Sequence, residues 1–420
     1  MRIEGLSEGC YHAPRFPFSM NALVRSALSH IKVGSLTVRD QDGKEYVFGK
    51  KGETPSGTLI IKSPEFYKRV LLGSLGFGEA YMDGLWDAAD NDLVNVVGVL
   101  LLNDVGESLP KSLKVAMHVF KDAHRRTKGS SKKNIQYHYD IGNDFYELFL
   151  DENMGYTCAY QIKPTDTIEQ MQNQKHELVC RKLGLKAGER IIDLGCGFGA
   201  MLRYAAKNYG ISGVGYTLSE GQVEWGNRRI KEEGLQDRIR IELKDYRDAE
   251  APCDKVVSIG MAEHAWDNKN GYGTMMEKIE SLLPEGGIGF VHTIGTTDAV
   301  DQPVDPWITK YIFPGSRMPR LQELMVAMNA AGLTVGHIEN LKLHYAETLR
   351  HWDEKFHRNI AKIRQLGPQY DDRFQRMWDF YLQGCNAGFR YGSMQLYQLV
   401  FCKGKRWTLP MNMEFGMPVV

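Results

Sequence analysis

Short apolar runs alternate with longer amphipathic segments through the middle of the chain. Residues 190–194, 210–218, 238–243 and 255–260 are rich in Ile and Val, and each run has the length of one buried strand. Because these strands alternate with helices, the pattern predicts a doubly wound parallel sheet of the α/β class. In such sheets, ligands bind at the carboxyl ends of the strands.

Later segments extend this sheet. Three further strands are predicted, at 288–292, 334–341 and 396–404. Helical spacing marks residues 165–183, 322–331 and most of 345–391. Residues 305–319 form an insertion rich in proline and aromatic residues, and 407–420 an irregular tail. The expected sheet therefore has seven strands and is mostly parallel.

The first 120 residues predict a separate, small α+β domain. Alternating residues flank Asp42-Gly43 and indicate a hairpin, and 57–62 predicts a third strand. Helices are expected at 21–31, after the Ser63 N-cap, and at 91–102, and the glycine-rich stretch 73–84 leads into Leu85-Trp86-Asp87. We expect an N-terminal domain over 1–120 for lipid presentation, dimerisation or both, a basic linker over 121–133, a catalytic domain over 134–405 and a tail over 406–420.

Composition adds limits to this picture. The chain of 420 residues carries 52 basic and 52 acidic side chains, so no overall charge favours nucleic acid. Its seven cysteines lack metal-ligand spacing and fit a reducing cytoplasm, so no metal site is expected. The N-terminus does not resemble a secretory signal, and the longest apolar run, 96–102, is too short to span a bilayer. We expect a cytoplasmic protein that is soluble or peripherally associated with the inner face of the cell membrane.

Local charge is concentrated in the linker. Residues 121–133 contain six Lys or Arg and one acid, Asp122. Two interpretations remain open: a solvated linker, or a surface that meets anionic lipid headgroups.

The stretch 190–200, RIIDLGCGFGA, predicts a strand that enters a glycine turn and opens a helix. Asp193 ends the strand, and glycines follow at 195, 197 and 199, where they let the backbone approach a ligand. A nicotinamide enzyme would more often show G-x-G-x-x-G with an acid about 20 residues later. The G-x-G-x-G spacing resembles that of class I methyltransferases, which bind S-adenosylmethionine, although a plain strand–turn–helix unit has the same appearance.

Polar residues gather where the predicted sheet would place an active site. Glu263 and His264 follow the fourth strand, His292 ends the fifth, Tyr345 follows the sixth, and Cys158 precedes the sheet. Each of them alone is more often structural than catalytic. Their coincidence at strand ends favours an active site.

Several motifs then point to one family. They are Gln136-Tyr137-His138-Tyr139-Asp140 with Gly142-Asn143, Tyr156-Thr157-Cys158-Ala159-Tyr160, the glycine loop, Asp245-Tyr246-Arg247-Asp248, Gly260-Met261 with Glu263-His264, His292-Thr293-Ile294-Gly295, residues 304–314, and 395–401. Over residues 134–405 the chain closely resembles the cyclopropane-fatty-acyl-phospholipid synthases, which include the mycolic acid cyclopropane synthases. The N-terminal region more loosely resembles the extra domain of the phospholipid-acting members.

This resemblance implies that the chain transfers a methylene group from S-adenosylmethionine to the cis double bond of an unsaturated phospholipid acyl chain. It implies a bound bicarbonate as base, held by Glu263, His292, Tyr345, Cys158 and Ile294, and it marks Cys385 as a further candidate catalytic residue. The implied cofactor contacts are Tyr137, Tyr156, Thr157, Asp193, Gly195, Cys196, Gly197, Gly199, Thr217, Leu218, Gln222 and Tyr246.

Three departures from the family pattern leave the product open. Phe198 stands where Trp is usual, Thr157 where Ser is usual, and Ala262 and Ala265 flank Glu263-His264 where larger residues are common. The alanines would enlarge the acyl pocket or move the bicarbonate, so a methylene-branched product is the main alternative. A catalytically silent lipid-binding protein and a small-molecule methyltransferase are the remaining alternatives.

Overall fold

The computed structural model describes residues 21–108, 141–250, 253–298, 304–411 and 415. The basic linker and Tyr137 lie outside these described residues. The described residues form two sheets, one of four strands and one of seven. None of the described helices has both the length and the apolar character that a bilayer span requires.

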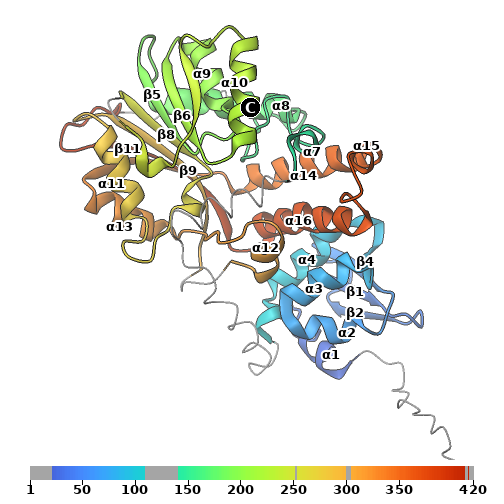
Figure 1. Cartoon of the computed structure of the whole chain (residues 1–420). Helices are drawn as coiled ribbons and strands as arrows, with labels where there is room; N and C mark the ends of the chain where they lie inside the picture. Colours follow the sequence, from blue (N-terminus) through green and yellow to red (C-terminus); the bar gives the residue numbers. More distant parts are fainter. Residues whose placement is uncertain (1–20, 109–140, 251–252, 299–303, 412–414, 416–420) are drawn as a thin grey trace, which may run out of the picture.

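The larger sheet has the strand order β10-β11-β9-β8-β5-β6-β7 (Figure 1). Its strands are β5 (Arg190–Leu194), β6 (Ser212–Thr217), β7 (Ile239–Leu243), β8 (Lys255–Ile259), β9 (Ile288–Thr296), β10 (Leu333–Asn340) and β11 (Met394–Lys403). Only β11 is antiparallel to both of its neighbours, and the remaining pairs are parallel. The predicted seven-stranded, mostly parallel sheet is confirmed.

Helices cover both faces of this sheet. One face packs against α8 (Ile168–Leu183), α9 (Ala200–Tyr209) and α10 (Glu220–Glu232), and the other against α11 (Gly273–Leu282) and α13 (Leu321–Ala330). The helix α8 begins at a capping box made by Thr167 and Gln170 and ends at left-handed Gly184. With both faces buried, the strands need no polar face, which explains their continuous apolar runs.

The smaller sheet has the order β2-β1-β3-β4 and forms the N-terminal domain. Its strands are β1 (Ser35–Arg39), β2 (Glu45–Gly49), β3 (Ser56–Ile61) and β4 (Trp86–Ala88), and its helices are α1 (Ala22–Leu28), α2 (Phe66–Arg69), α3 (Gly73–Met82) and α4 (Leu93–Leu102). The predicted hairpin is confirmed as β1 and β2, and β3 pairs parallel to β1.

The structure differs from the sequence analysis at two places. The glycine-rich stretch 73–84, to which no element was assigned, contains the helix α3 at residues 73–82. The fifth strand does not end at His292, because β9 continues to Thr296 in antiparallel pairing with β11. His292 therefore lies inside the strand.

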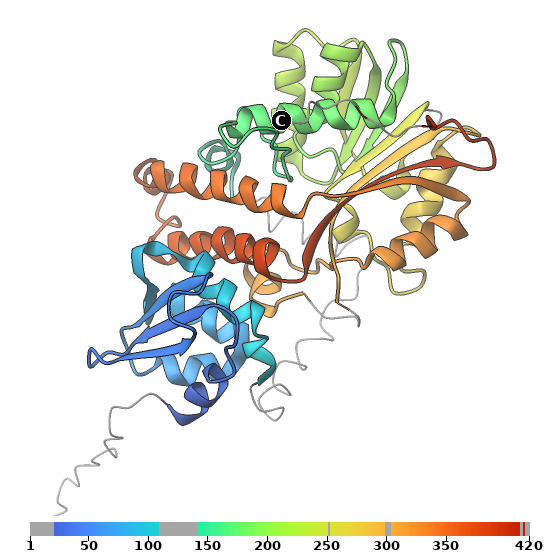
Figure 2. The ribbon, with the colours of Figure 1, turned by 180° about the vertical axis from the view of Figure 1, so that it is seen from behind.

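Four helices outside the sheet build the region between the two domains. They are α12 (Pro306–Tyr311), α14 (Lys342–Arg358), α15 (Ile360–Gln365) and α16 (Asp372–Tyr391), and the short α7 (Asn143–Glu147) packs nearby. Figures 1 and 2 show α16 between α14 and the N-terminal domain. Its contacts on the N-terminal side are with α3 and α4.

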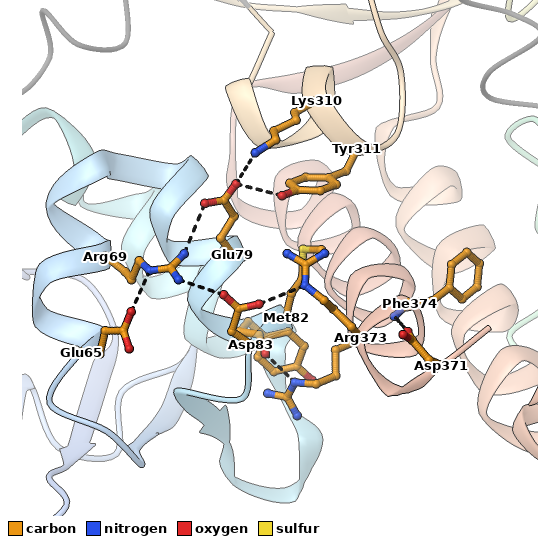
Figure 3. Close-up of polar contacts among 12 residues, drawn as sticks. Glu65, Arg69, Glu79, Met82, Asp83, Lys310, Tyr311, Asp371, Arg373 and Phe374 are labelled. Atoms are coloured by element: carbon orange, nitrogen blue, oxygen red, sulfur yellow. Dashed lines mark hydrogen bonds and ion pairs between the residues drawn. The ribbon is translucent and has the colours of Figure 1, made fainter. Parts of the chain in front are cut away.

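A charged network joins α3 to α12 (Figure 3). The carboxylate of Glu79 accepts hydrogen bonds from Lys310 Nζ at 2.6 Å and from Tyr311 OH at 2.9 Å. Arg69 pairs with Glu79 at 3.6 Å and with Asp83 at 3.2 Å. The N-terminal domain therefore holds α12 by ionic contacts as well as by apolar packing.

Candidate active site

A cavity of about 260 Å³ lies at the carboxyl ends of the parallel strands. Most of the side chains that sequence analysis singled out line it together. They are Tyr156, Thr157, Cys158, Gly195, Gly197, Thr217, Leu218, Gln222, Tyr246, Glu263, His292, Ile294, Tyr345 and Cys385. Residues from two strands, three helices and the turns between them thus meet at one place, as the fold class predicts.

The glycine loop forms one end of this cavity. All three glycines have positive φ, 79° at Gly195, 56° at Gly197 and 76° at Gly199, a region that side chains disfavour. A Cβ at Gly197 would meet no protein atom within 4 Å, so this glycine faces open space on the cavity side. The loop can therefore approach a ligand with its backbone alone.

Three of the predicted cofactor residues do not line the cavity. Gly199 starts α9 beside β7, where a Cβ would come within 2.5 Å of Ile241. Cys196 points at the neighbouring strand, since a Cβ on Gly215 would meet its Sγ at 2.6 Å. Asp193 is buried in β5, and burial raises its pKa to about 7. These residues shape the loop from behind.

Hydrogen bonds fix the side chains around the loop. Thr217 OH donates to Gln222 Oε1 at 2.5 Å, which ties the end of β6 to the start of α10. The buried Lys175 Nζ donates to Thr157 Oγ1 at 3.1 Å. Tyr246, in a short turn after β7, has a pKa raised to about 12 by burial. These contacts position the wall that a nucleoside would meet.

Glu263 and His292 form the polar end of the cavity. The backbone N–H of Ile294 donates to Glu263 Oε1 at 2.7 Å, which links the turn after β8 to β9. Among the described residues, neither Glu263 Oε2 nor His292 Nε2 has a hydrogen-bond partner, although both atoms are buried. Two unpaired buried polar atoms in one cavity wall indicate that a polar ligand completes them.

Burial controls the charge of both groups. It raises the pKa of Glu263 to about 7, against the opposing effect of the Ile294 hydrogen bond. Burial, together with the positive charges of Lys175 and Lys182, lowers the pKa of His292 well below its ordinary value. At neutral pH the imidazole is therefore neutral, and the carboxyl group is near its titration point.

The remaining predicted catalytic residues surround this pair. Tyr345, on α14, stacks on Phe389 with ring centroids 4.5 Å apart. The Cys158 thiol donates to the Ala159 carbonyl at 3.1 Å, and burial raises its pKa. Burial also raises the pKa of Cys385 to about 12, so its thiol is protonated at neutral pH and is not activated as a nucleophile.

Three aromatic residues that sequence analysis did not select, Phe313, Tyr381 and Phe389, also line the cavity and form an aromatic wall with Tyr156. Tyr381 OH and Tyr156 OH lie 2.9 Å apart in a hydrogen bond, and Phe313 packs within 6.4 Å of both rings. Tyr381 and Phe389 lie on α16 at the spacing of one helical face, together with Cys385. That spacing was the signal available in the sequence, but it equally describes a core helix.

Comparisons with known proteins agree with this geometry. A family model described as mycolic acid cyclopropane synthetase matches residues 126–399. The chain is 37% identical over 360 residues to a cyclopropane-fatty-acyl-phospholipid synthase of Escherichia coli, covering 84% of this chain and 89% of that protein. It is 33% identical over 376 residues to a probable fatty acid methyltransferase of Pseudomonas putida, covering 86% and 90%.

A solved structure shares the fold of the larger domain. The mycolic acid cyclopropane synthase CmaA1, complexed with SAH and CTAB, matches with a TM-score of 0.60 and 30% sequence identity, covering 65% of this chain and 98% of that chain. The class I methyltransferase fold predicted from the glycine loop is thus confirmed. The family model spans more than half of the chain, and the E. coli relative aligns over most of it. The chain therefore belongs to the mycolic acid cyclopropane synthetase family.

Proposed function

We propose that this protein uses S-adenosylmethionine to add a methylene group across the cis double bond of a phospholipid acyl chain, which gives a cyclopropane fatty acid. The observation that carries the proposal is the pair of unpaired buried atoms, Glu263 Oε2 and His292 Nε2, in an aromatic cavity beside a glycine loop. The names of the E. coli relative and of the CmaA1 structure support the reaction class.

The residues fit both ligands. The glycine loop with Thr217, Gln222 and Tyr246 suits a nucleoside, and the Glu263–His292 end suits a small planar anion that both accepts and donates hydrogen bonds. When bound, S-adenosylmethionine would supply an electrophilic methyl group, and bicarbonate would supply the base that ring closure needs.

We assign the stabilisation of positive charge on the acyl chain to the aromatic wall. Addition of a methyl group to an alkene leaves positive charge on the acyl chain, and water would trap that charge. The faces of Tyr156, Phe313 and Tyr381 can stabilise a cation, and the apolar rings offer water no hydrogen bonds on this side of the cavity. We assign the acyl double bond to this wall.

The methylene-branched product is the second candidate. It is favoured by the small side chain of Ala265 in the cavity wall, and the name of the P. putida relative, a probable fatty acid methyltransferase, fits either product. Both products need the same methyl transfer and differ in where the acyl chain loses its proton.

Lipid analysis tests the proposal. Membrane lipids from a host that expresses the chain should gain 14 mass units per modified acyl chain, and proton NMR should show the high-field signals of a cyclopropane ring. Olefinic methylene signals in their place would support the second candidate. Unchanged lipids from a host with soluble, S-adenosylmethionine-binding protein would overturn both.

Bicarbonate dependence tests the anion site separately. Assays in bicarbonate-free buffer should lose turnover while calorimetric binding of S-adenosylmethionine is retained. Full turnover without bicarbonate would contradict the anion assignment and leave the methyl transfer intact.

We further propose that the protein works at the inner face of the cell membrane, because its substrate resides there. The basic linker of the sequence, outside the described residues, is the segment that we assign to anionic headgroups. The homodimer stays a prediction, which analytical ultracentrifugation of the full chain can decide.

A further inference from the structure

A row of polar side chains crosses three neighbouring strands behind the cavity. In the sheet register, Glu339 on β10 lies opposite Gln398 on β11, and Gln398 lies opposite His292 on β9. Lys182 reaches this row from α8, where its side chain is fully buried. Gln398 and His292 are 0% and 1% exposed, so the Gln398 amide can be satisfied only by its protein partners, whereas Glu339 at the outer end of the row is partly exposed.

The hydrogen bonds along the row fix the orientation of the Gln398 amide. Lys182 Nζ donates to the Glu339 carboxylate and, at 2.6 Å, to Gln398 Oε1. The other end of the same amide, Gln398 Nε2, lies 3.1 Å from His292 Nδ1. A lysine ammonium has donors only, so the oxygen of the Gln398 amide must face Lys182. The reverse orientation would set the NH₂ group against the ammonium.

This orientation decides the state of the histidine. The NH₂ group of Gln398 is a donor, so Nδ1 of His292 must be an acceptor and cannot carry the ring proton. The proton of the neutral ring then resides on Nε2. His292 lines the cavity, and Nε2 is its buried ring nitrogen that has no partner among the described residues.

We infer that Lys182 and Gln398 are positioning residues that hold His292 as its Nε2–H tautomer, so that a hydrogen-bond donor faces the anion in the cavity. A ring with its proton on Nδ1 would instead present a lone pair to a negative ligand and repel it. Partners behind a ligand-binding histidine fix its tautomer in this way in metal sites. The catalytic part of the inference rests on the proposed function, whereas the tautomer itself does not.

Nitrogen NMR of the full-length protein labelled with ¹⁵N-histidine measures the tautomer without any turnover. The chain has 12 histidines, and the signal missing from a His292→Gln sample identifies the ring. At pH 7.5 the wild-type ring should show a protonated Nε2 and an unprotonated Nδ1. A protonated Nδ1 in wild-type protein overturns the inference.

Gln398→Glu is the decisive variant because it keeps shape and changes one donor into an acceptor. Its carboxylate should draw the ring proton to Nδ1. We expect kcat to fall on the order of 10- to 100-fold, the bicarbonate concentration for half-maximal rate to rise, and the Kd of S-adenosylmethionine to stay unchanged. An unaltered tautomer in this variant overturns the inference.

Gln375→Glu is the matched control. Gln375 is also buried but bonds to Tyr370 O and Arg364, away from His292. It should show the wild-type tautomer and bicarbonate response.

Lys182→Met is the second variant, to be used if Gln398→Glu fails to fold. Without the lysine ammonium, the Gln398 amide can flip, and both tautomers of His292 should be populated. A single Nε2–H state there overturns the role of Lys182.

The outcomes separate the two proposals. If wild-type turnover needs no bicarbonate while the tautomer responds to Gln398→Glu, the anion site fails and the positioning of His292 stands. If bicarbonate dependence holds and the tautomer does not respond, the proposed function stands and the inference fails.

Discussion

At the scale of single residues, Glu263 carries the clearest expectation. Glu263→Gln keeps the acceptor for Ile294 N–H but removes the carboxylate that faces the cavity. We expect kcat to fall on the order of 10²–10⁴-fold, the usual worth of a positioned proton-transfer group. Calorimetry should give the wild-type Kd for S-adenosylmethionine. A variant with wild-type kcat would remove Glu263 from the site.

The raised pKa of Glu263 also predicts how the difference in stability between Glu263→Gln and wild type changes with pH. Burial raises the pKa of Glu263 from 4.5 to about 7, so the folded wild-type protein holds a proton that the unfolded chain releases. Wild-type stability therefore falls as pH rises from about 4.5 to 7, and the glutamine variant lacks this loss. The Tm of the variant minus that of wild type should increase between pH 5 and pH 8. A constant difference would contradict the raised pKa.

Gly197 tests the cofactor loop. A valine there would have to adopt φ near 56° and would project into the cavity end that we assign to S-adenosylmethionine. Gly197→Val should abolish calorimetric binding of the cofactor. Gly188→Val is the control, because Gly188 also has positive φ and open space but does not line the cavity. Equal affinities in both variants would refute the loop assignment.

At the scale of elements, α12 connects the N-terminal domain to the acyl end of the cavity. Ile308 on this helix and Phe313 beyond it line the cavity, and Glu79 of α3 holds Lys310 and Tyr311. Glu79→Ala should loosen α12 by about 1 kcal/mol, since the ionic contacts are partly exposed. That loss corresponds to about fivefold in kcat/KM for vesicle lipid.

The control for this prediction is Glu53→Ala, which breaks an exposed ion pair with Lys50 away from α12. Both variants should bind S-adenosylmethionine with wild-type affinity, because neither Glu79 nor Glu53 lines the cavity that contains the glycine loop. A loss of cofactor affinity in Glu79→Ala would contradict the placement of the acyl chain near α12.

Elements were predicted well where local pattern and packing agree. The β5–β8 strands and the glycine turn follow from their apolar runs. The helix α3 could not be predicted, because its glycines serve tertiary contacts: a Cβ at Gly78 would come within 2.6 Å of Trp307, and one at Gly76 would collide with the Arg69 carbonyl. The extension of β9 was also hidden, because pairing with the distant β11 stabilises it.

In the candidate site, too, residues marked by local sequence patterns were found, and residues whose roles depend on tertiary contacts were missed. Glu263 and His292 were found from the sequence by their positions near predicted strand ends, and a family resemblance then implied their role. Lys182 and Gln398 were not found from the sequence. Their roles depend on the register of β11 against β9 and on the packing of α8, which is distant in sequence, beside these strands. In the sequence they are an ordinary helix lysine and a strand glutamine.

At the scale of the whole molecule, the basic linker gives a membrane prediction. Neutralising Arg125, Arg126, Lys132 and Lys133 should weaken sedimentation with anionic vesicles and flatten its salt dependence, at about 1 kcal/mol per charge. The control neutralises four exposed charges of the larger domain: Lys207, Arg228, Lys231 and Lys269. An equal loss of vesicle binding in both variants would show that binding depends on net charge and not on the linker.

The position of α16 has a consequence for the whole chain. One face of this helix presents Tyr381 to the cavity, and the other packs Phe380 against Phe77 and Trp307 of the two neighbouring parts. The two domains thus share one wall of the cavity. A core substitution far from any reacting atom would then raise the population of molecules whose cavity is open to water. If the proposed reaction holds, water would capture the acyl cation in those molecules, and the product would be an alcohol in place of a ring.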